Sequence, residues 1–169
     1  KDNNLNPSAI LNTHAHYDHV GAISKLKYEF SIPLFLHSQD DKLLKHANLY
    51  ANLFDGIGPI KIPTVDYYID QIDIQDYVKE FSIKVLFTPG HTWGSVCFFI
   101  EDSLFTGDTL LNGKIGRIDL PGGDASTLKK SLSIISKYPH ETRIYPGHGM
   151  PSIIGYELKH NNSFIQALQ

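Results

Sequence analysis

The stretch that most constrains this chain is Thr13-His14-Ala15-His16-Tyr17-Asp18-His19. Three histidines and one aspartate follow directly after the short apolar run Ala9-Ile10-Leu11. Imidazole nitrogens and carboxylate oxygens are ligands that divalent zinc or iron accepts. In an extended segment, side chains two residues apart share a face, so His14 and His16 are expected to reach one metal ion together. Asp18 and His19 then point elsewhere, and the stretch predicts the first half of a two-metal site.

Asp18 also has a simpler interpretation as a helix N-cap. The apolar residues Val20, Ile23 and Phe30 that follow it are spaced as on one face of a helix. Aspartate is one of the residues preferred at the position before a helix begins. Capping would explain Asp18 alone and would leave the neighbouring histidines unexplained, so both roles remain open at this point.

Three later segments each end an apolar strand and then present a single metal-ligating side chain. His91 follows Pro89-Gly90, Asp108 follows Gly107, and His148 follows Pro146-Gly147. Loops at strand ends are where catalytic and metal-binding groups are usually mounted. A carboxylate has two oxygens and can contact two cations, so Asp108 is expected to bridge a pair of metals.

Composition narrows the class of protein. The chain has 169 residues, of which 41% are hydrophobic and 20% charged, as expected for one globular domain over residues 1–169. The net charge of -3 and the lack of a long basic run argue against nucleic-acid binding. No apolar run approaches the roughly 20 residues of a membrane helix, so no membrane partner is expected. Cys97 is the single cysteine, which fits a reducing compartment and predicts a cytoplasmic location.

Hydrophobic periodicity predicts an alternation of strands and helices. The Gly- and Pro-rich segment 55–63 is either a mobile lid or an ordered surface connection. Residues 70–80 are expected to form the turn of a hairpin, and Asp124 is expected to cap a helix. Strands are predicted at 8–13, 32–36, 67–74, 81–88, 95–101, 103–106 and 143–145, and helices at 20–30, 38–53, 125–135 and 155–168.

The remaining reactive side chains are expected to have structural roles. Cys97 lies in an apolar strand and is assigned to the core, with a thiolate ligand as the less favoured alternative. Arg117 and Asp119 are expected to form an ion pair that fixes their loop, although Arg117 could instead meet an anionic substrate. The histidines outside the four motifs are expected to be structural or solvated, namely His37, His46, His140 and His160.

The four motifs, taken in order, resemble those of the metallo-β-lactamase superfamily. They are His-x-His-x-Asp-His, Pro-Gly-His-Thr-x-Gly-Ser, Gly-Asp and Pro-Gly-His-Gly. The loop from Gly116 to Asp124 and the segment Ile154-Gly155-Tyr156-Glu157 look like the compact, single-domain branch of the glyoxalase II-like hydrolases. The resemblance implies an α/β fold, a four-layer αββα sandwich with metals at the sheet edges. It also implies that the first strands of that fold precede Lys1, so that the domain at 1–169 is incomplete at its N-terminus.

The resemblance also implies a complete ligand set for two divalent ions, zinc first, with iron or manganese as alternatives. His14, His16 and His91 would hold the first metal. Asp18, His19 and His148 would hold the second, and Asp108 would bridge. The expected reaction is cleavage of a small-molecule thioester or ester by a metal-bridging hydroxide, with Asp18 or Asp108 as the catalytic proton shuttle.

Two alternatives remain at the level of sequence. The first is a mononuclear iron persulfide dioxygenase, which would use His14, His91 and Asp108 on iron. The second is a catalytically inactive metal-binding fragment.

Overall fold

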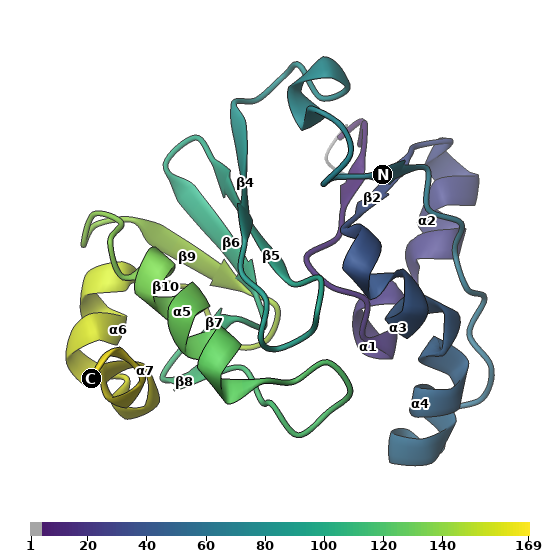
Figure 1. The fold of residues 1–169 in the computed structure, drawn as a ribbon. Helices are drawn as coiled ribbons and strands as arrows, with labels where there is room; N and C mark the ends of the chain where they lie inside the picture. Colours follow the sequence, from purple (N-terminus) through teal and green to yellow (C-terminus); the bar gives the residue numbers. More distant parts are fainter. Residues whose placement is uncertain (1–4) are drawn as a thin grey trace.

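The computed structural model describes residues 5–169, whose strands form two main sheets between two groups of helices (Figure 1). The smaller sheet is parallel, with the order β1-β2-β3. Helices α1 to α4 lie on one side of it, at the right of Figure 1. These elements are β1 (Ile10–Leu11), α1 (Tyr17–Val20), α2 (Ile23–Phe30), β2 (Leu34–Leu36), a 3-10 helix η1 (Ser38–Asp40), α3 (Asp41–Lys45), α4 (Ala47–Asp55) and β3 (Tyr67–Tyr68).

The larger sheet has five strands in the order β10-β9-β6-β5-β4. Its neighbours are antiparallel except β6 and β9, which run parallel. A short hairpin, β7 with β8, follows β6, and the last three helices cover the sheet's outer face (Figure 1). The elements are β4 (Ile83–Phe87), β5 (Val96–Ile100), β6 (Ser103–Gly107), β7 (Leu110–Leu111), β8 (Lys114–Ile115), α5 (Ala125–Ile135), β9 (Arg143–Pro146), β10 (Ser152–Ile153), α6 (Ile154–His160) and α7 (Asn162–Leu168).

Three apolar clusters hold these layers together. One cluster, which includes Leu36 and Leu43, lies between the smaller sheet and its helices. A second joins the two sheets through residues such as Phe35 and Phe98. The third packs the larger sheet against α5 and α7 and includes Phe164. The layer order is therefore helix, sheet, sheet, helix, and the expected αββα architecture is confirmed.

Several predicted boundaries were wrong, because non-local contacts override local periodicity. The predicted helix 38–53 is divided at His46 into α3 and α4. The predicted helix 155–168 is divided at Asn161, whose side chain accepts a hydrogen bond from the backbone N–H of Phe164 and begins a new helix.

The predicted hairpin of strands 67–74 and 81–88 was also wrong. Tyr67–Tyr68 pairs with β2 in the smaller sheet, whereas Ile83–Phe87 pairs with β5 in the larger one. The Asp66 carboxylate accepts a hydrogen bond from the backbone N–H of Leu34, and the Tyr67 ring stacks on Phe35 at 5.1 Å. These contacts hold the segment beside β2, and η2 (Ile74–Asp76) then leads the chain to the other sheet.

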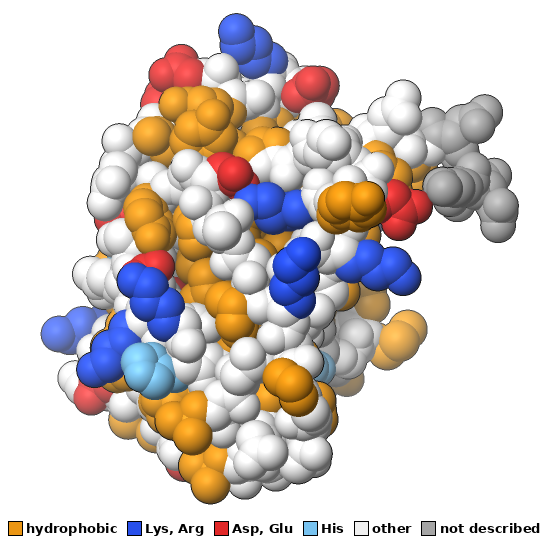
Figure 2. All heavy atoms as spheres, turned by 90° about the vertical axis from the view of Figure 1, so that its right-hand side faces the viewer, with side chains coloured by type: hydrophobic (Ala, Val, Ile, Leu, Met, Phe, Trp, Pro, Cys, Tyr) orange, Lys and Arg blue, Asp and Glu red, His pale blue; other side chains and the backbone are white. Residues whose placement is uncertain are grey.

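Among the described residues, no helix combines the length and the apolar character that crossing a bilayer requires. On the face that carries α2 and α4, hydrophobic side chains are interspersed with charged ones (Figure 2).

Candidate metal centre

The fold brings the seven predicted ligands together from four separate segments. His14 and His16 lie between β1 and α1, and Asp18 and His19 lie in the short helix α1 itself. The other three follow β4, β6 and β9. Their potential ligand atoms form three overlapping groups, each within 4.8 Å: His14, His16 and His91; His14, His19 and Asp108; and Asp18, His19 and His148.

The first of these groups is buried. His16 Nδ1 lies 2.9 Å from His91 Nε2, and the His14 ring centroid is 4.8 Å from that of His91. Three polar atoms in this group and in Asp108 beside it are buried without any hydrogen-bond partner: Nε2 of His14, Nε2 of His16 and Oδ1 of Asp108. Buried polar atoms without partners are rare and costly in folded proteins. A bound cation would satisfy such a cluster of lone pairs, so the residues present fit a metal site.

The third group, formed by Asp18, His19 and His148, is open to solvent. His148 Nε2 lies 3.0 Å from Asp18 Oδ2 and 3.1 Å from His19 Nε2. The side chains of His148 and Asp18 are 51% and 42% exposed. This part of the centre is therefore more exposed than the buried histidine triad behind it.

Asp108 lies between the buried group of His14, His16 and His91 and the exposed group of Asp18, His19 and His148. Its Oδ2 lies 3.7 Å from His91 Nε2 and 3.6 Å from His148 Nε2, and its Oδ1 lies 3.6 Å from His19 Nε2. The carboxylate therefore faces histidines of both groups at once. This placement matches the expectation of a bridging role, which remains a proposal.

Burial lowers the pKa of three imidazoles of this centre, those of His14, His16 and His19. Desolvation, and then the neighbouring imidazoles, hold the pKa of His14 well below its usual value. Desolvation, followed by the influence of His91, lowers the pKa of His16 to about 3. The pKa of His19 is also lowered by desolvation, although Asp108 and Asp18 oppose the shift. Neutral imidazole is the form that donates a lone pair to a metal, so these side chains are in the protonation state that metal binding would require.

Backbone contacts around the centre orient its side chains. His91 Nδ1 lies 2.8 Å from the carbonyl oxygen of Arg117. A proton on Nδ1 would be donated to that carbonyl, which leaves the Nε2 lone pair directed into the site. Gly147 leaves space that no other residue could leave, because a Cβ there would collide with Asp108 Oδ1 and His19 Cε1.

The structure also decides several open alternatives. Asp18 is not an N-cap: it lies inside α1, and neither α1 nor α2 begins with a side-chain cap. Arg117 makes the expected ion pair, with two hydrogen bonds of 2.8 and 2.7 Å to Asp119. Cys97 is fully buried, and burial raises the pKa of its thiol to about 12, so it belongs to the core. Asp124 caps α5 by accepting a hydrogen bond from the N–H of Thr127.

A cavity of about 270 Å³ opens onto the ligand cluster. Besides five of the predicted ligands, it is lined by residues that the sequence interpretation did not single out for binding: Tyr17, Leu111, Lys114, Ile115 and Leu120. Most of these residues come from the β7–β8 hairpin and the loop after it. No local pattern marked them, because a short hairpin inside a Gly-rich loop has no distinctive periodicity.

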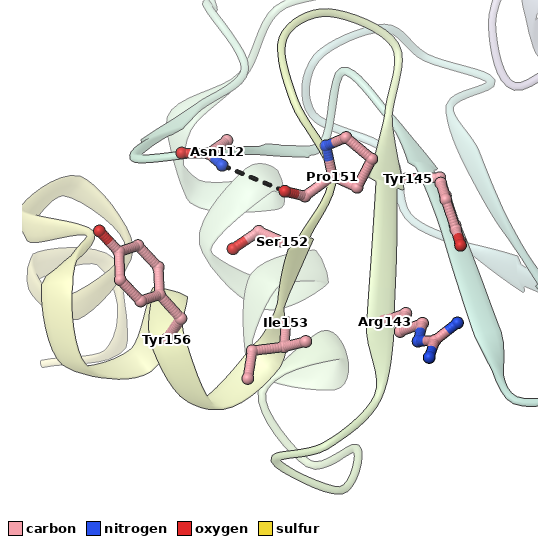
Figure 3. Close-up of a pocket in the computed structure, with 7 residues that line it drawn as sticks. All are labelled: Asn112, Arg143, Tyr145, Pro151, Ser152, Ile153 and Tyr156. Carbon is pink, nitrogen blue, oxygen red and sulfur yellow. Dashed lines mark hydrogen bonds between the residues drawn. The ribbon is translucent and has the colours of Figure 1, made fainter.

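A roomier cavity of about 560 Å³ lies away from the metal ligands, beside β9 and β10. Figure 3 shows Arg143 and Tyr145 on one side of it and Tyr156 on the other, with the side-chain amide of Asn112 donating to the carbonyl of Pro151. The residues that line it include neither histidine nor carboxylate. The chemistry of the molecule is therefore assigned to the smaller cavity over the histidine cluster.

Comparison with known proteins agrees with this geometry. The sequence model of the metallo-beta-lactamase superfamily matches residues 1–148. The chain is 37% identical over 153 residues to the probable metallo-hydrolase YqgX of Bacillus subtilis (strain 168), covering 88% of this chain and 72% of YqgX. It is 34% identical over 150 residues to the hydroxyacylglutathione hydrolase of Pelagibacter ubique (strain HTCC1062), covering 88% of this chain and 54% of that protein.

Two solved structures show the same fold. The di-iron-bound form of TTHA1623 has a TM-score of 0.81 and 37% identity, covering 92% of this chain and 77% of that one. The B3 metallo-beta-lactamase BLEG-1 has a TM-score of 0.85 and 36% identity, covering 95% of this chain and 78% of that one.

Proposed function

The chain belongs to the metallo-beta-lactamase superfamily of metal-dependent hydrolases, and on that premise we propose that it cleaves a small thioester or ester at a centre of two divalent ions. His14, His16 and His91 would hold the first ion, and Asp18, His19 and His148 the second, with Asp108 between them. Zinc suits this nitrogen and oxygen donor set, and so does iron.

The observation that carries the proposal is the convergence of unsatisfied donors. Nε2 of His14 and His16 and Oδ1 of Asp108 are buried without hydrogen-bond partners and belong to groups that could each enclose a cation. A protein that used these residues only for stability would lose free energy at each unsatisfied atom, about 1–3 kcal/mol. Their retention in one cluster supports a metal-binding role.

When bound, two divalent ions lower the pKa of water toward about 7 and polarise an acyl carbonyl. The chain's own contribution is to hold the ligands in place and to handle protons. Asp18 Oδ2 lies on the solvent side of the centre, 3.0 Å from His148 Nε2, and is the better-placed proton acceptor. Asp108 is only 12% exposed and is enclosed by three imidazoles, which suits it to a structural, bridging role.

The shape of the cavity supports a small acyl substrate. Its volume is about 270 Å³, near the lower limit of ordinary small-molecule sites. Leu111, Ile115 and Leu120 provide an apolar wall, while Lys114 and Arg117 place positive charge in the lining. An acyl group of modest size with a nearby anionic group would fit this lining. The similarity to a hydroxyacylglutathione hydrolase supports a thioester as the first substrate to assay.

The test is metal content and thioester hydrolysis measured on the same samples. We expect the wild-type protein to bind two ions per chain, and Asp108→Ala to lower the occupancy of the second ion and the rate of hydrolysis together. Asp102→Ala, which changes an exposed carboxylate in the β5–β6 turn, is the matched control. An Asp108→Ala protein that keeps both ions and full activity would contradict the assignment. Oxygen uptake with glutathione persulfide in place of hydrolysis would support the dioxygenase alternative.

A further inference from the structure

One buried carboxylate outside the ligand cluster is joined to both segments that carry the histidine triad. Asp40, in the 3-10 helix after β2, has 0% exposure. Its Oδ2 accepts hydrogen bonds of 2.8 Å from the backbone N–H of Ala15 and from the hydroxyl of Thr92. Its Oδ1 accepts a hydrogen bond of 2.7 Å from the backbone N–H of Gly94. We propose that Asp40 is a positioning residue that sets the mutual geometry of His14, His16 and His91.

The sequence positions of the three donors explain how this would work. Ala15 lies between His14 and His16, and Thr92 follows His91 directly. The two loops are far apart in the chain and lie in different layers of the fold, since one follows β1 and the other follows β4. A single carboxylate bonded to both fixes the distance between them. The position of the triad therefore depends on Asp40 although Asp40 is not among its ligands.

The local packing is also fitted to this carboxylate. A Cβ at residue 94 would lie 2.8 Å from the backbone nitrogen of Asp40 and 2.9 Å from its Cγ, so only glycine leaves room for the close approach. The Thr92 hydroxyl donates to Asp40 and lies 2.7 Å from the hydroxyl of Ser95, which can therefore donate to Thr92 in turn. The Thr-x-Gly-Ser sequence after His91 thus provides both the hydrogen-bond donors and the space that Asp40 needs.

The cost of burying this group argues for a specific role. Desolvation raises the pKa of Asp40, and hydrogen bonds from Ala15, Thr92 and Gly94 oppose that shift. Burying a carboxylate among neutral donors is expensive compared with an apolar side chain of similar volume. An apolar residue would fill the space but could not accept the three hydrogen bonds that join the two loops.

The decisive experiment compares Co²⁺ binding in Asp40→Asn and in the wild-type protein, by chelator competition and by the visible absorption spectrum of the bound ion. An asparagine keeps the shape of the aspartate side chain, but its NH₂ group faces hydrogen-bond donors and cannot accept from them. We expect about 10-fold weaker binding at the tighter site, the lower end of the usual effect of groups that support metal ligands, together with an altered spectrum. Asp41→Asn, which removes the neighbouring carboxylate that bonds Tyr68 and Lys45, should bind Co²⁺ like the wild type. Circular dichroism of the metal-free proteins checks that each variant is folded.

A second pair of variants covers the case in which Asp40→Asn does not fold. Thr92→Val removes one donor at nearly constant volume, and Thr92→Ser keeps the hydroxyl. We expect weaker Co²⁺ binding for valine and recovery to within about 2-fold of the wild type for serine, since only serine preserves the hydrogen bond. A folded Asp40→Asn with wild-type affinity and spectrum would overturn the proposal. Where Asp40→Asn is unfolded, a Thr92→Val protein that binds Co²⁺ like the wild type would overturn it.

This inference rests on the proposed metal centre, but its test does not depend on the proposed reaction. A wild-type protein that binds Co²⁺ and hydrolyses no thioester or ester would refute the proposed function. The comparison of Co²⁺ affinities would still decide the role of Asp40.

Discussion

As the pH is lowered, the metal-free protein should begin to lose stability at a higher pH than its carboxylates alone would predict. His16 should account for a measurable part of this loss. The pKa of His16 falls from 6.5 to about 3 in the folded state, mainly through desolvation. Between these two values the unfolded chain binds a proton that the folded chain does not. The free energy of unfolding therefore rises with pH in this window, is fully restored above about pH 6.5, and declines as the pH falls.

The size of the effect follows from the same shift. Each pH unit below 6.5 costs about 1.4 kcal/mol for one histidine held neutral, so lowering the pH to about 4.5 costs about 3 kcal/mol from His16 alone. His14, whose pKa is also lowered, adds to the loss with the same sign. The carboxylates with lowered pKa, such as Asp70 and Asp119, also stabilise the fold. Their contribution to the free energy of unfolding is lost mainly when the pH falls below 3.8, the usual pKa of aspartate. Above about pH 4.5 these two carboxylates therefore contribute little to the pH dependence. Asp40, whose pKa is raised by desolvation, acts with the opposite sign to the histidines, so the effect of His16 is isolated by comparison with a variant that lacks it.

The assay is urea unfolding of the metal-free protein at several pH values between about 4.5 and 7, followed by the fluorescence of Trp93, which lies two residues from His91. His16→Gln removes one titrating group from the centre. Its free energy of unfolding should depend less steeply on pH than that of the wild type, by about 1.4 kcal/mol per unit. Equal slopes for the two proteins would refute the argument that burial keeps this imidazole neutral. With metal added, the free energy of unfolding should fall more steeply as the pH is lowered, because metal binding also requires neutral imidazoles.

Two further substitutions test other parts of the structure. Gly147→Ala should weaken metal binding by at least about 10-fold, measured by chelator competition, because the added methyl group would collide with Asp108 and His19; unchanged affinity would mean that the loop yields freely. Glu157→Gln should lower the free energy of unfolding by about 2 kcal/mol in urea titrations, because the buried carboxylate accepts hydrogen bonds from Gly113, Ser152 and Asn161. A loss below about 0.5 kcal/mol would show that the amide is accommodated without an unpaired donor.

The convergence of the seven candidate ligands could be anticipated from the sequence because each one carries its own local signal. His91, Asp108 and His148 each follow an apolar strand and a glycine, and strands that end at one edge of a sheet bring such residues together. The layer order could be predicted only through the family resemblance. Periodicity did not assign strands to sheets: Tyr67–Tyr68 reads like the first half of a hairpin, and only its packing on Phe35 and β2 places it in the other sheet.

The role of Asp40 shows why the rest could not be predicted. From the sequence it is one of two adjacent aspartates at the start of a predicted helix, where capping is the natural interpretation. In the structure it caps nothing, and its partners lie 25, 52 and 54 positions away. The same holds for Thr92, Gly94 and Ser95, which are not among the predicted ligands and yet form part of the motif around His91. Their residue types are explained only by their contacts with the carboxylate of Asp40, which comes from another layer of the fold. The residue type at a motif position that is not a ligand can thus be explained by a contact with a residue far away in the sequence. Only the three-dimensional structure shows which residue that is.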